Sequence, residues 1–236
     1  MTISAPLHHL KRKAKLVSRD AGIPLHAALD RIAAEQGYDG WSLLAAKAAE
    51  ATPAKKLFPR LAPGDMILVG ARPGQGKTRF SLQLCIAAME KGHDCYFFTL
   101  EYTEKDVAAQ LARIAAPPRS AGKLIADTAD SINAAHIIAR LQGAPRGALV
   151  VIDYLQLLDQ RRENPPMAEQ VRQLKGFAAA SGVILIFISQ IDRAYDPAVK
   201  PFPDLADVRL PNPLDLGLFN KTCFMNNGEI RFRANP

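Results

Sequence analysis

The segment 70–78 constrains the fold most strongly, because it reads GARPGQGKT and follows an apolar run that ends at Val69. Glycines in such a segment let backbone N–H groups turn inward around phosphate oxygens, and the N-terminus of the following helix adds positive potential. Lys77 is then placed to reach the β- and γ-phosphates of a nucleotide, and the Thr78 hydroxyl to ligate Mg²⁺. The strict pattern G-x-x-x-x-G-K-[ST] is missed at its first position, where Ala71 stands. The residues expected to contact the nucleotide are Ala71, Arg72, Pro73, Gly74, Gln75, Gly76, Lys77, Thr78 and Arg79.

From residue 64 onward, apolar runs alternate with helical patterns, which is typical of a parallel sheet covered on both faces. The predicted strands are 66–69, 95–100, 149–153, 183–189 and 222–225, and the predicted helices are 77–90, 104–114, 132–142 and 167–180. Asn227-Gly228 predicts a hairpin turn, with a returning strand over 230–233. We therefore expect an α/β domain over 64–236 that binds its ligand at the carboxyl ends of the strands.

Three polar residues end predicted strands at this edge. Asp153 follows the run LVVI and is suited to hold Mg²⁺ together with Thr78. Glu101 ends YFFTLE and is the candidate base for an attacking water, with a helix-capping role as the competing interpretation. Gln190 ends ILIFISQ, where an amide could sense the γ-phosphate. The expected catalytic set is Lys77, Glu101, Asp153 and Gln190, and the expected metal ligands are Thr78 and Asp153.

The first quarter of the chain is different, because residues 1–60 hold ten Lys/Arg and five Asp/Glu, whereas residues 61–236 hold twenty and eighteen. Helical spacing predicts a small basic all-α module over 1–51, and the prolines and lysines of 52–63 predict a linker. A helix-turn-helix corner near Gly37 is the DNA-reading alternative. Direct readout of bases needs Arg, Asn or Gln along the second helix, but Lys47 is the only basic residue of the segment 41–50. A partner-docking module is the favoured interpretation, with a first helix able to touch phosphates.

The strings GARPGQGKT, FFTLE, VVIDYLQLL and ISQIDR together resemble the RecA-like P-loop ATPases, and most closely the motor domain of DnaB-type replicative helicases. In that family an alanine at the first loop position is usual, which accounts for Ala71. The resemblance covers about residues 60–195 and implies a RecA-like core that binds ATP and Mg²⁺. It also implies a homo-oligomeric ring, such as a hexamer, and single-stranded DNA as a partner.

The chain departs from this family near its end, where a DnaB-type motor carries an arginine finger that completes the neighbouring subunit's site. Matching the segment 228–231 to the family places Cys223 at the finger position and Lys221 two residues before it. If Thr222–Met225 is matched to the preceding strand of the family instead, the finger hairpin is missing, so the usual finger is absent in either alignment. The substitutes that remain open are Arg209, Lys221, Arg231 and Arg233.

Three functions follow from these features. The first is an Mg²⁺-dependent ATPase that translocates on single-stranded DNA or unwinds DNA. The second is a RecA/KaiC-like switch whose nucleotide state controls assembly or partner binding, and the third is a module that holds ATP with little hydrolysis. The longest apolar run, 183–188, is far shorter than the roughly 20 residues of a membrane helix, so no membrane partner is expected. The basic residues Lys11, Arg12, Lys13 and Lys15 are not joined to the apolar core of a secretory signal, so a cytoplasmic protein is expected.

Overall fold

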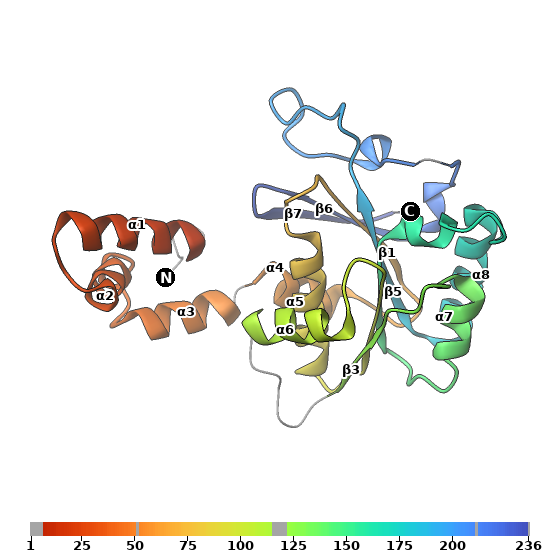
Figure 1. The fold of residues 1–236 in the computed structure, drawn as a ribbon, viewed down its shortest axis with the longest axis horizontal. Helices are drawn as coiled ribbons and strands as arrows, with labels where there is room; N and C mark the ends of the chain where they lie inside the picture. The colour runs from red at the N-terminus through yellow and green to blue at the C-terminus, as the bar shows by residue number, and fades with distance from the viewer. Residues whose placement is uncertain (1–6, 51, 115–121, 211, 236) are drawn as a thin grey trace. The chain divides into compact units, whose positions relative to one another are not determined.

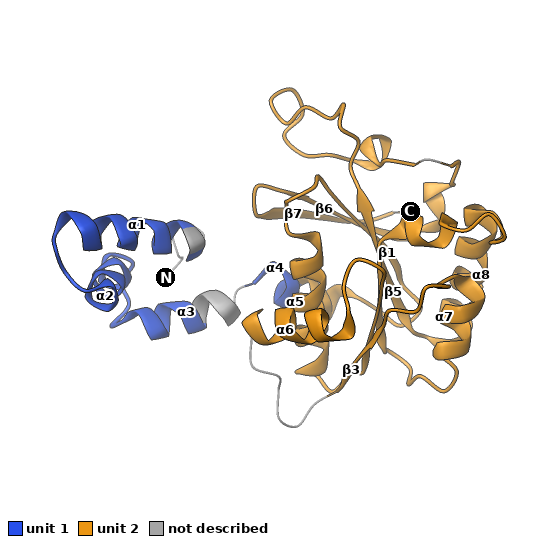
Figure 2. Ribbon diagram, viewed as in Figure 1, with its two compact units in different colours: residues 1–56 blue, residues 57–236 orange. Residues whose placement is uncertain are grey.

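The computed structural model describes residues 7–50, 52–114, 122–210 and 212–235. Its chain divides into two compact units, residues 1–56 and 57–236 (Figure 2). Residues 1–6 and 51 of the predicted module lie outside the described residues.

The helices α1 (Leu7–Asp20), α2 (Leu25–Glu35) and α3 (Trp41–Glu50) belong to the first unit. Gly22 and Gly37 follow the first two helices with positive φ of 62° and 80°, as expected for helix ends that a left-handed residue terminates. A small core holds the helices together and consists of Leu10, Ala14, Ala28, Ile32, Ala33 and Leu44. The predicted helical module thus has its own apolar core.

The segment 52–63 differs from the predicted linker. It contains the short helix α4 (Pro53–Leu57) and the 3-10 turn η1 (Phe58–Arg60). Leu57 and Phe58 are buried, with 1% and 7% of their surfaces exposed. The prolines and lysines of this segment predicted a linker, and the hydrophobic effect that buries Leu57 and Phe58 stabilises its turn.

The second unit is built on a seven-stranded sheet in the order β3-β2-β4-β5-β1-β6-β7. Six strands are parallel and β7 pairs antiparallel with β6. The strands are β1 (Met66–Ala71), β2 (Cys95–Thr99), β3 (Leu124–Asp127), β4 (Leu149–Asp153), β5 (Ile184–Gln190), β6 (Lys221–Asn226) and β7 (Glu229–Ala234). The helices are α5 (Lys77–Met89), α6 (Glu104–Ile114), α7 (Ala134–Arg140) and α8 (Met167–Ser181), and the 3-10 turns are η2 (Leu155–Asp159), η3 (Leu205–Asp207) and η4 (Leu216–Leu218).

Helices cover both faces of this sheet, with α5 and α6 on one side and α7 and α8 on the other (Figure 1). The central strands β1, β4 and β5 are buried almost throughout, as parallel strands between two helical layers must be. On the α7–α8 side, Leu68, Val150 and Phe187 join one core with Val171 and Leu174 of α8. The predicted fold class, an α/β core with a mostly parallel sheet, is confirmed.

Two details of the sheet differ from the sequence-based prediction. The strand β3 was not predicted, because its four residues form a short run in which only Asp127 is buried. The strand β1 continues to Ala71 and so includes Gly70, which the sequence pattern assigns to the loop. A Cβ on Gly70 would lie 2.7 Å from Cε1 of Phe224 and 3.1 Å from Cδ1 of Ile191. Glycine is therefore required there by close packing against β6.

Candidate active site

The phosphate-binding segment runs from the end of β1 to the start of α5, as predicted. Gly74 and Gly76 have φ of 78° and 80°, in the left-handed region that residues with a Cβ rarely adopt. A Cβ at either position would have no neighbouring atom within 4 Å, so backbone conformation rather than space selects glycine here. The backbone turns at these two positions and enters α5 at Lys77. Such a turn in front of a helix N-terminus is suited to phosphate oxygens.

The ammonium group of Lys77 folds back over this segment. Its Nζ donates hydrogen bonds to the backbone oxygens of Ala71, at 3.1 Å, and Arg72, at 3.2 Å. Burial lowers the pKa of Lys77, whereas the carboxylates of Asp153 and Glu101 raise it in part. The ammonium is therefore held by carbonyl groups in the loop, close enough to two carboxylates to interact with both.

Asp153 ends β4 and meets the first turn of α5. The Thr78 hydroxyl donates a hydrogen bond to Oδ2 of Asp153 at 3.0 Å, across 75 residues of sequence. Asp153 is 3% exposed. Burial raises its pKa to about 6, against the opposing effects of the Thr78 hydrogen bond and of Lys77, and the charge of Glu101 raises it further. The two predicted metal ligands are thus in direct contact.

Glu101 lies just beyond β2, whose last residue Thr99 is in register with Asp153. Its backbone N–H donates to Oγ1 of Thr99 at 3.1 Å, and its side chain is exposed. Its negative charge raises the pKa of both Asp153 and Lys77, so Glu101 interacts electrostatically with both of these residues. The competing capping role is taken by Thr103 and Asp106, since the N–H of Asp106 donates to Oγ1 of Thr103 at 3.2 Å and the N–H of Thr103 to Oδ2 of Asp106 at 3.0 Å.

Gln190 ends β5 in register with Ala71, so it lies beside the start of the phosphate-binding segment. Its backbone oxygen accepts from the N–H of Arg209 at 2.9 Å. The oxygen of Arg209 in turn accepts from Nε2 of Gln156 at 2.8 Å. Gln156 belongs to the string VVIDYLQLL, in which no contact could be assigned to the glutamine from sequence. Hydrogen bonds of Arg209 therefore join the chain after β5 to the end of β5, which lies beside the phosphate-binding loop, and to the turn after β4.

One contact of the loop was not predicted. Oε1 of Gln75 accepts a hydrogen bond from the backbone N–H of Asn227 at 2.9 Å. Asn227 has a positive φ of 50° in the turn between β6 and β7. The Asn-Gly pair predicted this turn, but nothing local indicated that the turn would reach the phosphate-binding loop.

Two of the positions considered for an arginine finger, Lys221 and Cys223, are not exposed in the structure. Lys221, at the start of β6, forms an ion pair with Asp65 and donates to the oxygen of Arg60 at 2.9 Å. Because β6 runs parallel to β1, this pair lies at the end of the sheet opposite the phosphate-binding loop. Cys223 is completely buried, and burial raises its pKa to about 12. Neither residue is available at the surface as a charged finger.

The remaining candidates are at the surface. Arg209, Arg231 and Arg233 are exposed. The guanidinium of Arg231 lies 4.4 Å from the ring centroid of Phe202. Arg231 and Arg233 line a cleft of about 350 Å³ together with the segment 200–205. This geometry removes Lys221 from the predicted substitutes and leaves the three arginines.

The oxygen atoms of Thr78 and Asp153 can be compared with the ligands that Mg²⁺ usually has in proteins. Mg²⁺ is usually held by one or two protein oxygens, with phosphate and water completing its shell. A hydroxyl and a carboxylate at 3.0 Å supply such a pair, and a cation beside Asp153 would favour its ionised form. Within the described ranges, no three His, Cys, Asp or Glu side chains cluster as a self-sufficient metal site. The donor set therefore fits Mg²⁺ bound together with a nucleotide.

Comparison with known proteins identifies the family of the chain. The family model described as DnaB-like helicase C terminal domain matches residues 55–120 and 110–212. The chain belongs to this family. Its P-loop, residues 70–78, lies inside the matched region. The matched region begins at residue 55, so α1, α2 and α3 lie outside it.

Two relatives illustrate the similarity of this DnaB-like chain. The replicative DNA helicase DnaB of Leifsonia xyli subsp. xyli is 29% identical over 182 residues, which are 63% of this chain and 40% of the relative. The probable plasmid replicative DNA helicase of Chlamydia trachomatis is 24% identical over 212 residues, 74% of this chain and 47% of the relative. The chain thus spans less than half the length of each.

Solved structures support the RecA-like fold. A DnaB-like replicative helicase, described with its interactions with primase, superposes with a TM-score of 0.57 at 17% identity, covering 92% of this chain and 66% of that one. The ATPase domain of G40P superposes with a TM-score of 0.55 at 18% identity, covering 77% and 79%. Among the described residues, no helix has the length and apolar character needed to cross a membrane.

Proposed function

We propose that the chain binds ATP with Mg²⁺ and hydrolyses it at the carboxyl edge of its sheet. The observation that carries this proposal is the convergence of Lys77, Thr78 and Asp153, with the charge of Glu101 acting on two of them. Lys77 would leave its carbonyl partners to contact the β- and γ-phosphates, and Thr78 and Asp153 would hold Mg²⁺. The bound ion would supply neutralising charge to the phosphate oxygens.

Glu101 has the remaining role in this proposal. Its exposed carboxylate lies at the tip of the strand next to β4 and could accept a proton from the attacking water. Gln190 adjoins the loop through the register of β5 with β1, so its amide could respond to the γ-phosphate. Residues 71–79 would form the nucleotide contacts.

We further propose that the protein acts as a homo-oligomeric ring, such as a hexamer, that moves on single-stranded DNA in the cytoplasm. Membership of the DnaB-like family supports this, and the exposed Arg209, Arg231 and Arg233 are the candidates for completing a neighbour's site. A RecA-like switch, in which ATP controls assembly without unwinding, is the second candidate. It is favoured by the buried Cys223 and paired Lys221 at the positions where the finger of a motor is expected.

ATPase measurements with and without single-stranded DNA, combined with light-scattering mass with and without nucleotide, distinguish these functions. A motor should show DNA-stimulated hydrolysis that weakens steeply with salt. A switch should show no stimulation but a nucleotide-dependent mass. Lys77→Ala is the control: if it keeps ATP affinity and hydrolysis, the assignment of the phosphate-binding loop is wrong.

A further inference from the structure

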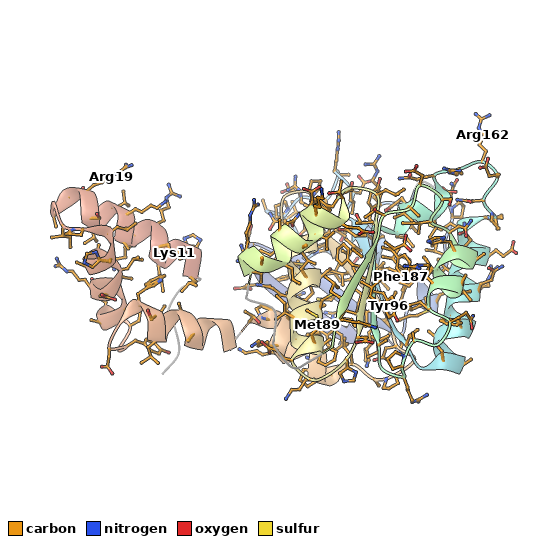
Figure 3. The ribbon with its side chains drawn as sticks, turned by 60° about the horizontal axis from the view of Figure 1, so that its bottom comes forward. Lys11, Arg19, Met89, Tyr96, Arg162 and Phe187 are labelled. Carbon is orange, nitrogen blue, oxygen red and sulfur yellow. The ribbon has the colours of Figure 1, made fainter. Side chains whose placement is uncertain are left out.

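Helix α1 of the first unit has an unusual distribution of charge. Its 14 residues, LHHLKRKAKLVSRD, contain five basic side chains and one acidic one. Lys11, Arg12, Lys15 and Arg19 are exposed. Figure 3 marks Lys11 and Arg19 on this helix. The charge is therefore presented to solvent along most of the helix length.

These four side chains share one side of α1. Successive residues of an α-helix are turned by about 100°, so Lys11, Lys15 and Arg19 lie at about 0°, 40° and 80° around the axis. Arg12 lies at about 100° by the same rule, which confines all four to an arc of about 100°. The buried Leu10 and Ala14 lie at about 260° and 300°, on another side. We call Lys11, Arg12, Lys15 and Arg19 the basic face.

In the described part of the first unit, no acidic side chain pairs with the basic face. Glu35 pairs with Lys13, at 2.6 Å, and Lys13 lies outside the arc. Oδ1 of Asp30 instead accepts from the backbone N–H of Trp41 at 2.8 Å. Within the part of the chain that the structure describes, none of the four basic side chains forms an ion pair. Lys11 and Lys15, and Lys15 and Arg19, are like-charged i,i+4 neighbours, which is unfavourable for the helix until an anion approaches.

We propose that the basic face binds the phosphate backbone of nucleic acid without reading its sequence. At a rise of 1.5 Å per residue, Lys11, Lys15 and Arg19 are spaced by about 6 Å along a line of about 12 Å. A row of evenly spaced cations matches a polyanion with evenly spaced charges. Contacts of this kind fix a protein on the backbone and carry no base information.

A membrane surface matches the basic face less well. Helices that lie on membranes bury an exposed apolar side beside their charged side. The apolar side of α1 is instead used inside the unit, where Leu10 and Ala14 are 4% and 0% exposed. Leu16, 53% exposed, is the one large apolar residue that α1 exposes widely in its described part. The observations thus favour nucleic acid.

The test uses the full chain without ATP, and measures fluorescence anisotropy of labelled single-stranded and duplex oligonucleotides between about 50 and 200 mM salt. The variant Lys11→Gln/Lys15→Gln/Arg19→Gln keeps good helix formers at all three positions. If each removed charge contacts a phosphate, the slope of log affinity against log salt falls by about 2 on single strands and about 3 on duplex. With equal affinities extrapolated to 1 M salt, these slopes lower the affinity at 0.1 M by roughly 100-fold on single strands and by several hundredfold on duplex.

A matched control removes three exposed charges elsewhere. Arg31→Gln/Arg172→Gln/Lys175→Gln has the same net charge as the basic-face variant, and its three positions are exposed. It should bind within about twofold of the parent, because only contacting cations release counterions. Lys11→Arg/Lys15→Arg should also retain binding. Circular dichroism confirms that α1 remains helical.

Equal affinities and slopes for the basic-face and control variants would overturn the proposal. So would a basic-face variant that loses binding to phosphatidylserine vesicles while keeping its nucleic-acid affinity. The binding does not depend on ATP hydrolysis, so Lys77→Ala should leave it intact. Failure here and failure of the proposed ATPase are therefore separate results.

Discussion

The Thr78 hydroxyl lies 3.0 Å from Oδ2 of Asp153 and donates a hydrogen bond to it. This contact joins the first turn of α5 to the end of β4 and leaves a carboxylate buried beside Lys77. Burial raises the Asp153 pKa from 3.8 to about 6, so the nucleotide-free fold disfavours the ionised form.

Asp153→Asn should therefore stabilise the nucleotide-free protein. The folded state retains a proton on Asp153 at pH values where the unfolded chain has lost it. The free energy of unfolding thus falls as pH rises between about 4 and 6, and remains at the lower level above pH 6. The variant removes this loss, which is up to about 3 kcal/mol at pH 7.5. Urea denaturation from pH 4 to 8 measures it.

The same variant should lose the stabilisation that ATP with Mg²⁺ confers, because it lacks the carboxylate. Asp130→Asn, at an exposed position, is the control and should change neither quantity. A parent and an Asp153→Asn protein of equal stability at pH 7.5 would show that the carboxylate is not disfavoured by burial.

Glu101→Gln should retain nucleotide binding and reduce hydrolysis by about 10²- to 10⁴-fold, because the amide cannot accept the proton of the attacking water. Steady-state turnover and fluorescent-nucleotide affinity measure the two effects separately. The substitution also removes a negative charge that raises the pKa of Asp153. The fall in the free energy of unfolding that Asp153 causes with rising pH should therefore end at a lower pH. Glu104→Gln, exposed in the first turn of α6, should leave turnover unchanged. Unchanged turnover in Glu101→Gln would remove the glutamate from the proposed role.

Gly70→Ala should destabilise the protein by about 1–3 kcal/mol, because the new methyl group must displace the ring of Phe224. The shift adjoins the phosphate-binding loop, so ATP affinity should fall as well. Adding Phe224→Leu should recover part of both losses. Gly176→Ala is the control, since no atom lies within 4 Å of its Cβ, and it should stabilise α8 by about 0.5–1 kcal/mol. Thermal unfolding compares all four proteins.

Lys221→Ala should destabilise the fold by about 3 kcal/mol without reducing turnover of the protein that remains folded. Burial raises the pKa of Asp65, but hydrogen bonds from Lys221, the backbone of Ala62 and Asn220 outweigh it, so the pKa lies below its ordinary value. That lowered pKa contributes stability at neutral pH which is lost as the pH falls through it, and the variant should weaken this dependence because it removes one of the three partners. Lys123→Ala, at an exposed site, should stay within about 0.5 kcal/mol of the parent. A stable Lys221→Ala protein with lost ATPase activity would instead support a finger role.

The local parts of the proposed site could be predicted from residues that are close in sequence. The spacing of Gly74, Gly76 and Lys77 predicts a loop before a helix, since positive φ and a helix N-terminus are local properties. The polar strand tips were also predicted, because an apolar run followed by one carboxylate is visible in the letters alone. The strand β3 and the turn η1 were missed because short segments carry little periodicity, and they are ordered by the surfaces that they cover.

The amino-acid sequence by itself determined which residues reach the carboxyl edge of the sheet and that a nucleotide loop opens α5. The tertiary structure brings the two predicted Mg²⁺ ligands, Thr78 and Asp153, into contact. It alone decided that Gln75 contacts Asn227 and that Lys221 pairs with Asp65 at the opposite edge of the sheet. The physical reason is strand order. The arrangement β4-β5-β1-β6 depends on packing between segments far apart in the chain, and no local pattern encodes it.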